Sequence, residues 1–308
     1  MRNILIVGAL LVCFSAAAQP RKMAVTIDDL PFMVAGHPQY LPNAQRVTKE
    51  LMRVLRAHQV PAIGFVNERQ LQVTGEMDAR VALLQQWLDA GLTLGNHTYS
   101  HPDLNAVSIE QYQDDIVRGD IVLRRLMHPR TPVYFRHPMT HTGETQAKKE
   151  AIDSFLALRG YKITPHTIEN SDFIYNISYV RARRGNDAAM QKKLRDSYLD
   201  FTIAATEFAE KISPQIFGRE IPQTLLIHAN DLNADCLDEL LKRYEKRGYR
   251  FITLDEAMND PAYQTKDTNV SRNGPTWLWR WMKSKGMNVS FKDDPELPGW
   301  VMDLYRQN

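Results

Sequence analysis

Short apolar runs alternate with amphipathic segments along most of this chain. The apolar runs predict strands at residues 23–27, 61–66, 92–95, 133–135, 161–164, 224–227 and 251–254. The amphipathic segments between them predict helices at residues 43–58, 78–90, 108–127, 144–158, 188–212 and 235–247. Strands that alternate with helices pair in parallel through right-handed crossovers. The pattern therefore predicts an α/β fold, either a barrel or a doubly wound sheet.

The two ends of the chain depart from this pattern. Residues 1–18 combine the basic residue Arg2, an apolar run at residues 4–14 and a small-residue cleavage site, as a secretory signal does. The apolar run is shorter than the roughly 20 residues that cross a bilayer. We therefore expect an exported protein, periplasmic or secreted, without stable membrane insertion. Residues 19–262 predict one domain, and residues 263–308 predict a tryptophan-rich tail packed on the barrel.

Charge and cysteine content narrow the functional classes. The chain has 38 Lys and Arg residues against 36 Asp and Glu residues, for a net charge of +2. Bulk charge therefore gives no indication of nucleic-acid binding. Cys236 is the only cysteine outside the expected signal, so an internal disulfide is excluded in the mature chain. The oligomeric state stays open.

Reactive side chains collect where predicted strands end. Asp28 and Asp29 end the first strand, and His97, Arg136 and His228 each follow a later one. In a parallel barrel the carboxyl ends of the strands share one face, where catalytic residues gather. Because successive side chains of a strand point to opposite sides, we expect Asp28 and Asp29 to take different roles, one on a metal and one on a water beside it.

Two histidines four positions apart, His97 and His101, lie just past the strand at residues 92–95. Neutral imidazole suits Zn²⁺ and its divalent neighbours. Two histidines alone bind weakly, so the Asp28–Asp29 pair is the best candidate to complete the ligand set. The alternatives are surface loop histidines and an aspartate pair that forms a turn or caps a helix.

Five motifs carry a family resemblance. They are TIDD at 26–29, HTYSH at 97–101, RHP at 136–138, DF at 172–173 and LIH at 226–228. In this order and at strand ends, they resemble the polysaccharide deacetylases of carbohydrate esterase family 4, the group that shares the NodB homology domain. The resemblance covers residues 22–256. It implies a distorted (β/α) barrel of about seven parallel strands.

The resemblance also implies a metal site. Asp29, His97 and His101 match the family's metal ligands. The metal would be a divalent ion, Zn²⁺ above all, with Co²⁺ or Ni²⁺ as alternatives. Three protein ligands leave open positions, where the metal activates a water and polarises the amide carbonyl.

Four further residues match the family's catalytic groups. Asp28 matches the general base and His228 the general acid that protonates the leaving amine. Arg136 matches the arginine that orients the base. Asp172 matches the carboxylate that supports the acid histidine and favours its charged form.

The chain departs from the family pattern at three positions. Leu30 stands where the family usually has glycine, Met139 where an aromatic residue often follows the proline, and Phe173 where tryptophan is usual. The oxyanion donor in the family is backbone, so Met139 need not abolish activity. These departures bear on the substrate more than on the reaction type.

The implied function is metal-dependent hydrolysis of N-acetyl groups from an N-acetylated glycan, with release of acetate. Peptidoglycan, chitin-like oligomers and poly-N-acetylglucosamine are candidate substrates. The alternatives are an O-acetyl esterase on a glycan, a small amide or imide hydrolase on the same barrel, and an inactive glycan-binding protein.

Two regions remain open at this level. Residues 172–223 are longer than one strand-to-helix unit needs, and the sequence does not say whether they cover the cleft as a lid. Within them, Asp172 is expected in a short polar loop and residues 181–184 in a solvated loop. The tail holds Trp277, Trp279, Trp281 and Trp300, whose rings either pack on the barrel wall or stack on sugar rings.

Overall fold

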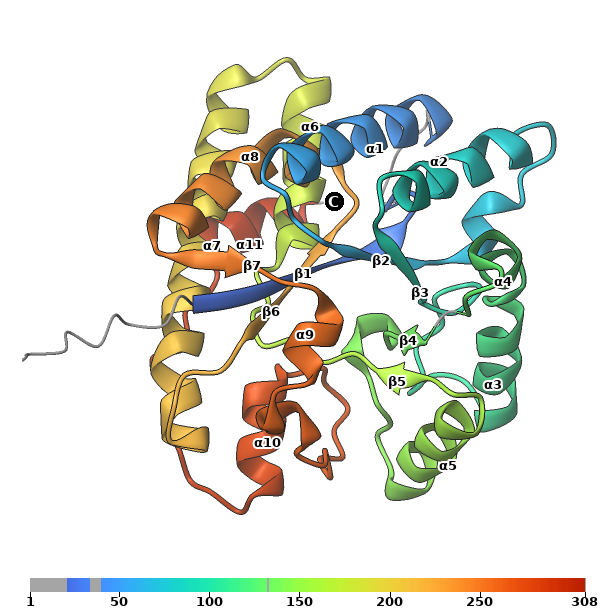
Figure 1. Ribbon diagram of the computed structural model, residues 1–308. Coiled ribbons are helices and arrows are strands. Elements are labelled where there is room, and N and C mark those ends of the chain that lie inside the picture. Colours follow the sequence, from blue (N-terminus) through green and yellow to red (C-terminus); the bar gives the residue numbers. More distant parts are fainter. Residues whose placement is uncertain (1–20, 34–39, 132, 308) are drawn as a thin grey trace, which may run out of the picture.

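The computed structural model of the chain describes residues 21–33, 40–131 and 133–307 (Figure 1). The expected signal at residues 1–18 lies outside these residues and stays a prediction. Within the described part of the chain, no helix combines the length and the apolar character that a membrane span requires.

A single seven-stranded parallel sheet forms the centre of the fold (Figure 1). Its strands are β1 (Arg21–Leu30), β2 (Ile63–Val66), β3 (Thr93–Asn96), β4 (Tyr134–Phe135), β5 (Lys162–Ile163), β6 (Gln223–His228) and β7 (Tyr249–Phe251). The order across the sheet is β5-β4-β3-β2-β1-β6, and β7 pairs with the start of β1. The prediction of about seven parallel strands is confirmed.

The chain after β5 joins the two edges of the sheet. The N–H groups of Thr167 and Ile168 both donate to the carbonyl of Thr224 in β6, at 2.9 and 3.1 Å. The N–H of Leu226 donates in turn to the carbonyl of Ile168 at 3.1 Å. The sheet is therefore curled into a distorted barrel, and the carboxyl ends of its strands meet at one rim.

Helices cover the outside of the curled sheet (Figure 1). They are α1 (Tyr40–Ala57), α2 (Met77–Asp89), α3 (Ile109–Arg118), α4 (Ile121–Met127), α5 (Gln146–Leu158), α6 (Asp172–Arg184), α7 (Ala188–Phe217), α8 (Asp231–Lys246), α9 (Leu254–Met258), α10 (Trp277–Ser284) and α11 (Gly299–Arg306). Most match a predicted helix, although α1 begins before Asn43 and α8 begins before Asp235. The start of α8 is set by Asn230, whose side chain accepts a hydrogen bond from the N–H of Asn233 at 2.8 Å.

The helix expected over residues 108–127 is broken into α3 and α4. Ser108 caps α3 as expected, through a reciprocal pair of hydrogen bonds with Gln111. The chain then turns at Gly119, which lies against the loop that follows β3. A Cβ at position 119 would stand 2.4 Å from the carbonyl carbon of Thr98. The prediction of one continuous helix is therefore wrong, and the break allows close packing beneath the histidine loop.

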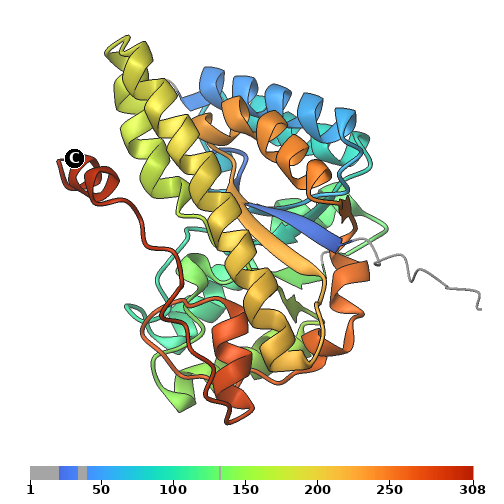
Figure 2. The ribbon, with the colours of Figure 1, turned by 90° about the vertical axis from the view of Figure 1, so that its left-hand side faces the viewer.

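The largest difference from the sequence prediction is α6. Its buried residues lie on most of its sides, so it lacks the single apolar stripe of an amphipathic helix. Asp172 is in its first turn rather than in a polar loop, and residues 181–184 form its last turn rather than a solvated loop. Both loop predictions are therefore wrong. Helix α6 packs against α7 and α8, so residues 172–217 form a helical hairpin on the barrel wall (Figure 2).

The C-terminal residues extend this outer layer. Helix α10 packs on α7, and α11 packs on α6 (Figure 2). Trp277 and Trp281 are buried, and the Trp281 ring meets Phe217 and Tyr263 edge-on at centroid distances of 5.6 and 5.1 Å. These two tryptophans are therefore packing residues and offer no free face to a sugar. The domain boundary after residue 262 stays a prediction.

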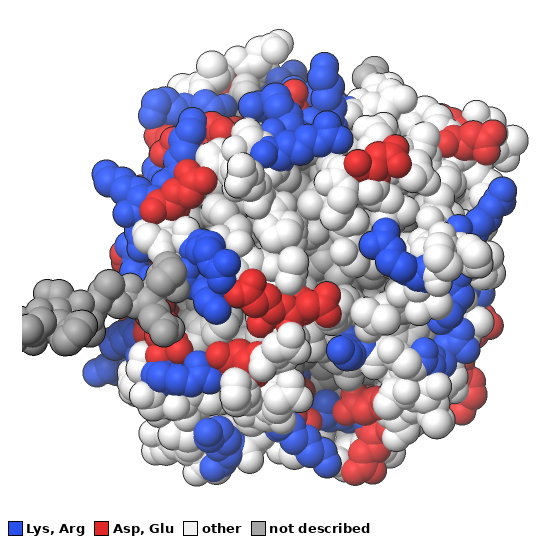
Figure 3. All heavy atoms as spheres, viewed as in Figure 1, with Lys and Arg blue, Asp and Glu red and all other residues white. Residues whose placement is uncertain are grey.

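The distribution of surface charge does not indicate a binding site. On the face shown in Figure 3, basic and acidic side chains lie side by side. Several are neighbours on one helix, such as Lys242 and Asp238. Exposed pairs of this kind contribute about 0.2 to 1 kcal/mol each. The candidate functional side chains lie at the rim of the barrel.

Candidate metal centre and active site

The strand ends enclose a cleft with a volume of about 580 Å³. It brings together the predicted metal ligands, the predicted base and the predicted acid, listed with their strands as Asp28 and Asp29 of β1, His97 and His101 after β3, and His228 of β6. The cleft is also lined by residues from α6, from the loop after β4 and from the segment before α10. The expected convergence of these five side chains is thus present in the structure.

Three of these side chains form a cluster with the geometry of a metal site. Asp29 Oδ1 lies 3.6 Å from His97 Nε2 and 3.6 Å from His101 Nε2, too far for good hydrogen bonds. Zn²⁺ ligand atoms lie about 2.0–2.2 Å from the ion, so atoms that share one ion are roughly 3–3.5 Å apart. Asp29 Oδ1 is buried and has no hydrogen-bond partner among the described residues. This group is the one potential metal cluster found in the described part of the chain, and its donors fit a divalent ion.

The tautomer of His97 is set by the neighbouring strand. Asn96 is in register with Phe135, so His97 lies beside Arg136. His97 Nδ1 is 2.7 Å from the carbonyl oxygen of Arg136. A carbonyl only accepts, so Nδ1 carries the proton and Nε2 keeps a lone pair for a metal. Burial, together with the nearby charge of His101, holds the pKa of His97 well below its usual value and keeps the ring neutral.

The loop that carries the two histidines is held in an unusual conformation. Thr98 and His101 both have left-handed backbone, with φ of 67° and 59°. The Asn96 side chain accepts from the N–H of Thr98 at 2.7 Å, and Thr98 Oγ1 accepts from the N–H of His101 at 3.1 Å. Asp115 of α3 accepts from both the N–H and the hydroxyl of Ser100 at 2.7 Å. These contacts support a strained backbone, which is characteristic of functional sites.

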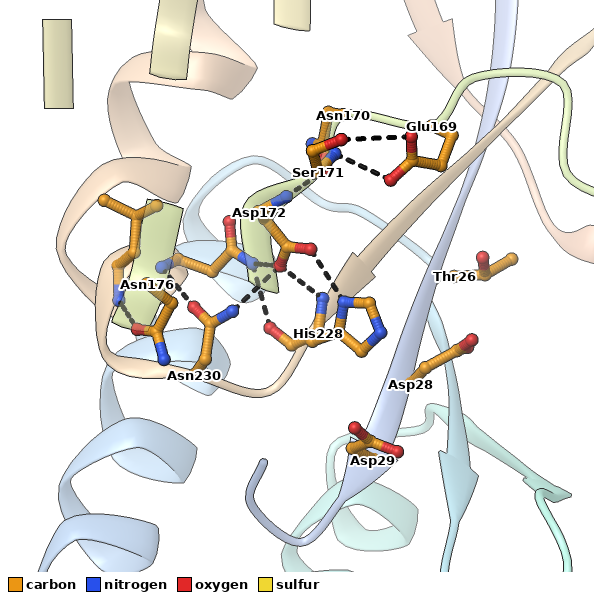
Figure 4. Close-up of polar contacts among 12 residues, drawn as sticks. Thr26, Asp28, Asp29, Glu169, Asn170, Ser171, Asp172, Asn176, His228 and Asn230 are labelled. Carbon is orange, nitrogen blue, oxygen red and sulfur yellow. Dashed lines mark hydrogen bonds and ion pairs between the residues drawn. The ribbon is translucent and has the colours of Figure 1, made fainter. Parts of the chain in front are cut away.

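Asp28 and Asp29 do not point to opposite sides as predicted. The register of β1 against β2 shifts between Ile27 and Leu30, and Asp29 has a φ of 64°. This irregularity cancels the alternation of a regular strand. Both carboxylates therefore line the same cleft (Figure 4), and their different roles stay a prediction.

Asp28 is buried beside positive charge but has few partners. Its Oδ2 lies 3.9 Å from His97 Nε2, and its Oδ1 has no hydrogen-bond partner among the described residues. Burial raises the pKa of Asp28, while the charges of Arg136 and His228 oppose that rise. Arg136 is fully buried and donates to Thr26 Oγ1 at 2.8 Å rather than to Asp28. Arg136 therefore acts on Asp28 through its charge.

His228, the register partner of Asp28 on the adjacent strand, is held by the fully buried Asp172. His228 Nδ1 is 2.7 Å from Asp172 Oδ1, and its own N–H donates to Asp172 Oδ2 at 2.8 Å (Figure 4). Asn230 and Asn233 donate to the same oxygen. Burial alone would lower the pKa of His228, but the charge and hydrogen bond of Asp172 outweigh it and raise the pKa to about 10. The ring is thus an imidazolium across the physiological range.

Comparison with known proteins found related sequences and structures. A family model described as polysaccharide deacetylase matches residues 15–154. The peptidoglycan-N-acetylglucosamine deacetylase of Bacillus cereus is 22% identical over 247 residues, which cover 78% of this chain and 70% of that protein. The chain is thus similar to polysaccharide deacetylases over this part of its length.

Two solved structures share the fold of this chain. The chitin deacetylase of Colletotrichum lindemuthianum superposes with a TM-score of 0.53 at 20% identity, over 79% of this chain and 89% of that one. A mutant of a Bacillus anthracis CE4 family pseudoenzyme, with restored enzymatic activity, superposes with a TM-score of 0.51 at 18% identity, over 79% and 69% of the two chains. At these identities the likeness shows the barrel fold alone.

The three departures from the family pattern have clear places in the structure. Leu30 is fully buried against Gly64, where a Cβ would lie 2.4 Å from its Cδ2. The larger residue at 30 is therefore matched by a glycine on the adjacent strand. Met139 and Phe173 both line the cleft, and the Phe173 ring meets the His228 ring edge-on at 5.9 Å.

Several neighbours of the candidate site residues were not predicted from the sequence. Asn230 and Asn233 support Asp172, and Tyr198 of α7 donates to Asn233 Oδ1 at 2.6 Å. Glu169 lines the cleft and accepts from the N–H of Ser171 at 2.7 Å. The Asn-x-x-Asn spacing directly after His228 is a signal that could have identified the two asparagines, because it marks a helix start beside the acid.

Two further histidines near the rim differ in their surroundings. His141 lines the cleft, with its Nδ1 2.8 Å from Asp103. His137 is buried and stacks on Tyr112 at a centroid distance of 5.9 Å. His141 therefore lies where a substrate in the cleft could contact it. His137 packs against Tyr112 of α3 instead.

Proposed function

We propose that this protein is a metal-dependent deacetylase that hydrolyses N-acetyl groups of an N-acetylated glycan and releases acetate. One observation carries the proposal. The Asp29–His97–His101 cluster lies in one cleft with Asp28, a buried carboxylate whose Oδ1 has no hydrogen-bond partner among the described residues, and with His228, the proposed acid. Similarity to the polysaccharide deacetylase family model and to the relatives named for peptidoglycan and chitin supports a glycan substrate.

The residues of the cleft divide the hydrolysis between them. A divalent ion held by Asp29, His97 and His101 would lower the pKa of a water and polarise the substrate carbonyl. Asp28 accepts the proton of the attacking water, for which it is suited by its raised pKa and by an Oδ1 that no described residue hydrogen-bonds. Arg136 keeps part of the carboxylate ionised through its charge.

His228 completes the reaction by protonating the leaving nitrogen. An amine is a poor leaving group unless it is protonated, so the acid must begin as an imidazolium. Asp172 binds Nδ1 and leaves the Nε2 proton for the leaving nitrogen. The pKa of about 10 keeps this proton in place until the carbon–nitrogen bond breaks.

Acetate release from a panel of N-acetylated and O-acetylated glycans tests the proposal. The protein is stripped of metal, then reloaded with Zn²⁺ or Co²⁺, and Asp28→Asn serves as the matched inactive control. Metal-dependent acetate from an N-acetylated polymer supports the proposal, and acetate from O-acetylated polymers alone would make the protein an esterase. Glycan binding without hydrolysis would indicate an inactive binding protein. Absence of both, in protein that binds one metal, would favour a small amide or imide substrate.

We also propose that the protein is exported to the periplasm or the medium. The composition of residues 1–18 supports this. Expression of the complete chain, followed by fractionation and N-terminal sequencing, should give a product that begins near Gln19 outside the cytoplasm. A cytoplasmic product that retains residues 1–18 would contradict it.

A further inference from the structure

The segment that leads into α10 reaches the wall of the cleft. Gly274 lines the cleft together with Met139 and Thr140, which belong to the loop after β4. Thr140 Oγ1 donates to the carbonyl of Gly274 at 2.8 Å. A region more than 130 residues away in the chain thus touches the loop that directly follows Arg136, His137 and Pro138.

The loop after β4 needs support from outside. Met139 and Thr140 have φ values of 54° and 53°, so two successive non-glycine residues are left-handed. This conformation is unfavourable for side chains with a Cβ and persists only where surrounding contacts fix it. The loop lines the same cleft as His97 and His101, so its position affects the space for a substrate.

Arg280 of α10 supplies these contacts. It is fully buried, and its Nη2 donates to the carbonyl of Thr140 at 2.8 Å, while Nη1 donates to Thr142 Oγ1 at 2.7 Å. Its Nε donates to the carbonyl of Pro275 at 3.0 Å. One planar guanidinium therefore clamps the loop and the Gly274 segment to each other.

The guanidinium is itself fixed by its surroundings. Asp267 Oδ2 lies 3.3 Å from Arg280 Nη1 and 3.3 Å from Lys149 Nζ, so the buried charges are paired. The Trp277 ring lies 4.6 Å from the guanidinium carbon. The N–H of Trp277 donates to the carbonyl of His166 at 2.8 Å, which ties the segment to the chain that closes the barrel.

Gly274 fits this contact for a steric reason. A Cβ at position 274 would lie 1.9 Å from Thr140 Oγ1 and 2.3 Å from the carbonyl oxygen of Met139. The second atom is backbone, so the loop itself would have to move. The loop and the C-terminal segment therefore meet at a distance that only glycine permits.

We propose that Arg280 is a positioning residue for catalysis, which holds the Met139–Thr140 loop in its active shape from the C-terminal segment. The inference rests on the proposed function, because the loop acts on the acetylated group bound in the cleft. If Arg280 has this role, residues 267–280 support the active site and are not only an outer layer of the fold. Displacement of a catalytic element by about 1 Å can cost about 100-fold in rate.

Arg280→Lys and Gly274→Ala test the proposal in the full-length, metal-loaded protein. Lysine keeps the charge beside Asp267 but loses the fork, and alanine pushes the loop directly. We expect kcat for the best glycan to fall about 10- to 100-fold in each, with KM changed less than about threefold and one metal retained per chain. Lys283→Ala, an exposed change on the same helix, is the matched control and should keep the wild-type kcat.

Hydrogen exchange supplies a readout that does not require activity. Amides in peptides that cover residues 136–145 should exchange at least about 10-fold faster in Arg280→Lys, while those at residues 93–101 keep their rates. Should Arg280→Lys fail to fold, Thr142→Val removes one acceptor of the guanidinium and should show a smaller effect in the same direction.

The outcomes separate the two proposals. An active wild type with unchanged kcat and unchanged loop exchange in folded Arg280→Lys and Gly274→Ala would overturn the role of Arg280 alone. Faster loop exchange with unchanged kcat would likewise overturn it, since the loop would be held but irrelevant to turnover. A wild type that releases no acetate would refute the proposed function and the catalytic role together, whatever the exchange rates.

Discussion

Asp28 lines the cleft and Asp172 holds His228, and these two buried aspartates have 2% and 0% of their surface exposed. Their pKa values shift in opposite directions. Burial raises the pKa of Asp28 above its ordinary value. Burial acts in the same direction on Asp172, but the charge of His228 and several hydrogen bonds outweigh it and lower the pKa.

Hydrogen bonds explain the difference. Asp172 accepts four of them, from the ring and the N–H of His228 and from the amides of Asn230 and Asn233. Asp28 has an oxygen with no partner among the described residues, and Arg136 stabilises its charge only from a distance. A carboxylate with many donors stays ionised and supports its neighbour, whereas one with few is ready to take a proton.

The largest expected effect separates the base from the metal ligands. Asp28→Asn keeps the size of the side chain but removes the proton acceptor, so kcat should fall about 10²- to 10⁴-fold while one metal stays bound. His97→Ala should lose both metal and turnover. Metal analysis and acetate release check both variants. Full activity in Asp28→Asn would end the assignment of the base.

The next effect concerns the pH range of the acid. With a pKa of about 10, His228 stays protonated, and we expect the alkaline limb of kcat near that pH. In Asp172→Asn the favourable charge is gone while burial remains, so the limb should move to about 6.5 or below. At pH 8.5 the activity would then fall about 100-fold or more.

The pH profile of kcat for wild type and Asp172→Asn, measured from pH 5 to 10.5, checks this shift. Activity at the acid end should change much less, because the histidine is protonated there in both proteins. An alkaline limb that does not move would show that another group donates the proton.

A smaller effect is expected one contact further out. Asn233→Ala removes a donor to Asp172 and leaves the Tyr198 hydroxyl without its acceptor. The free energy of unfolding should fall by about 1–3 kcal/mol, because buried polar groups lose partners. Urea unfolding measures it, with the exposed Asn288→Ala as the control, for which a change within about 0.5 kcal/mol is expected. Equal stabilities would place the network outside the stable core.

The metal side of the cleft could be read from the sequence more fully than the acid side. His97 and His101 lie four residues apart beyond an apolar strand, and Asp29 ends another, so their convergence follows from the parallel fold. The shared orientation of Asp28 and Asp29 could not be foreseen, because it depends on an irregularity in β1.

The supports of the acid side come from distant parts of the chain. Asp172 and Asn230 are 58 residues apart, and Arg280 reaches Thr140 across 140 residues. No local pattern encodes such contacts. Helix α6, which carries Asp172, was missed because its buried residues lie on most of its sides. Sequence patterns thus predicted which candidate side chains come together. The contacts that shift their pKa values and fix their positions required the tertiary structure.

The smallest effect tests whether a carboxylate must be buried to raise the pKa of a histidine strongly. His58 bonds Glu245 and Asp238 at 2.7 and 3.0 Å, but both carboxylates are well exposed. Desolvation would lower its pKa, and the two hydrogen bonds outweigh that and raise it. Because the pKa of His58 is raised in the folded state, the contact stabilises the fold fully below pH 6.5. This stabilisation is lost as the pH rises through the folded-state pKa of His58. Replacing His58 by Ala should therefore cost about 0.5 kcal/mol at pH 5.5 and nearly nothing at pH 9 by urea unfolding. A larger cost at pH 9 would mean that packing, rather than charge, makes the contact.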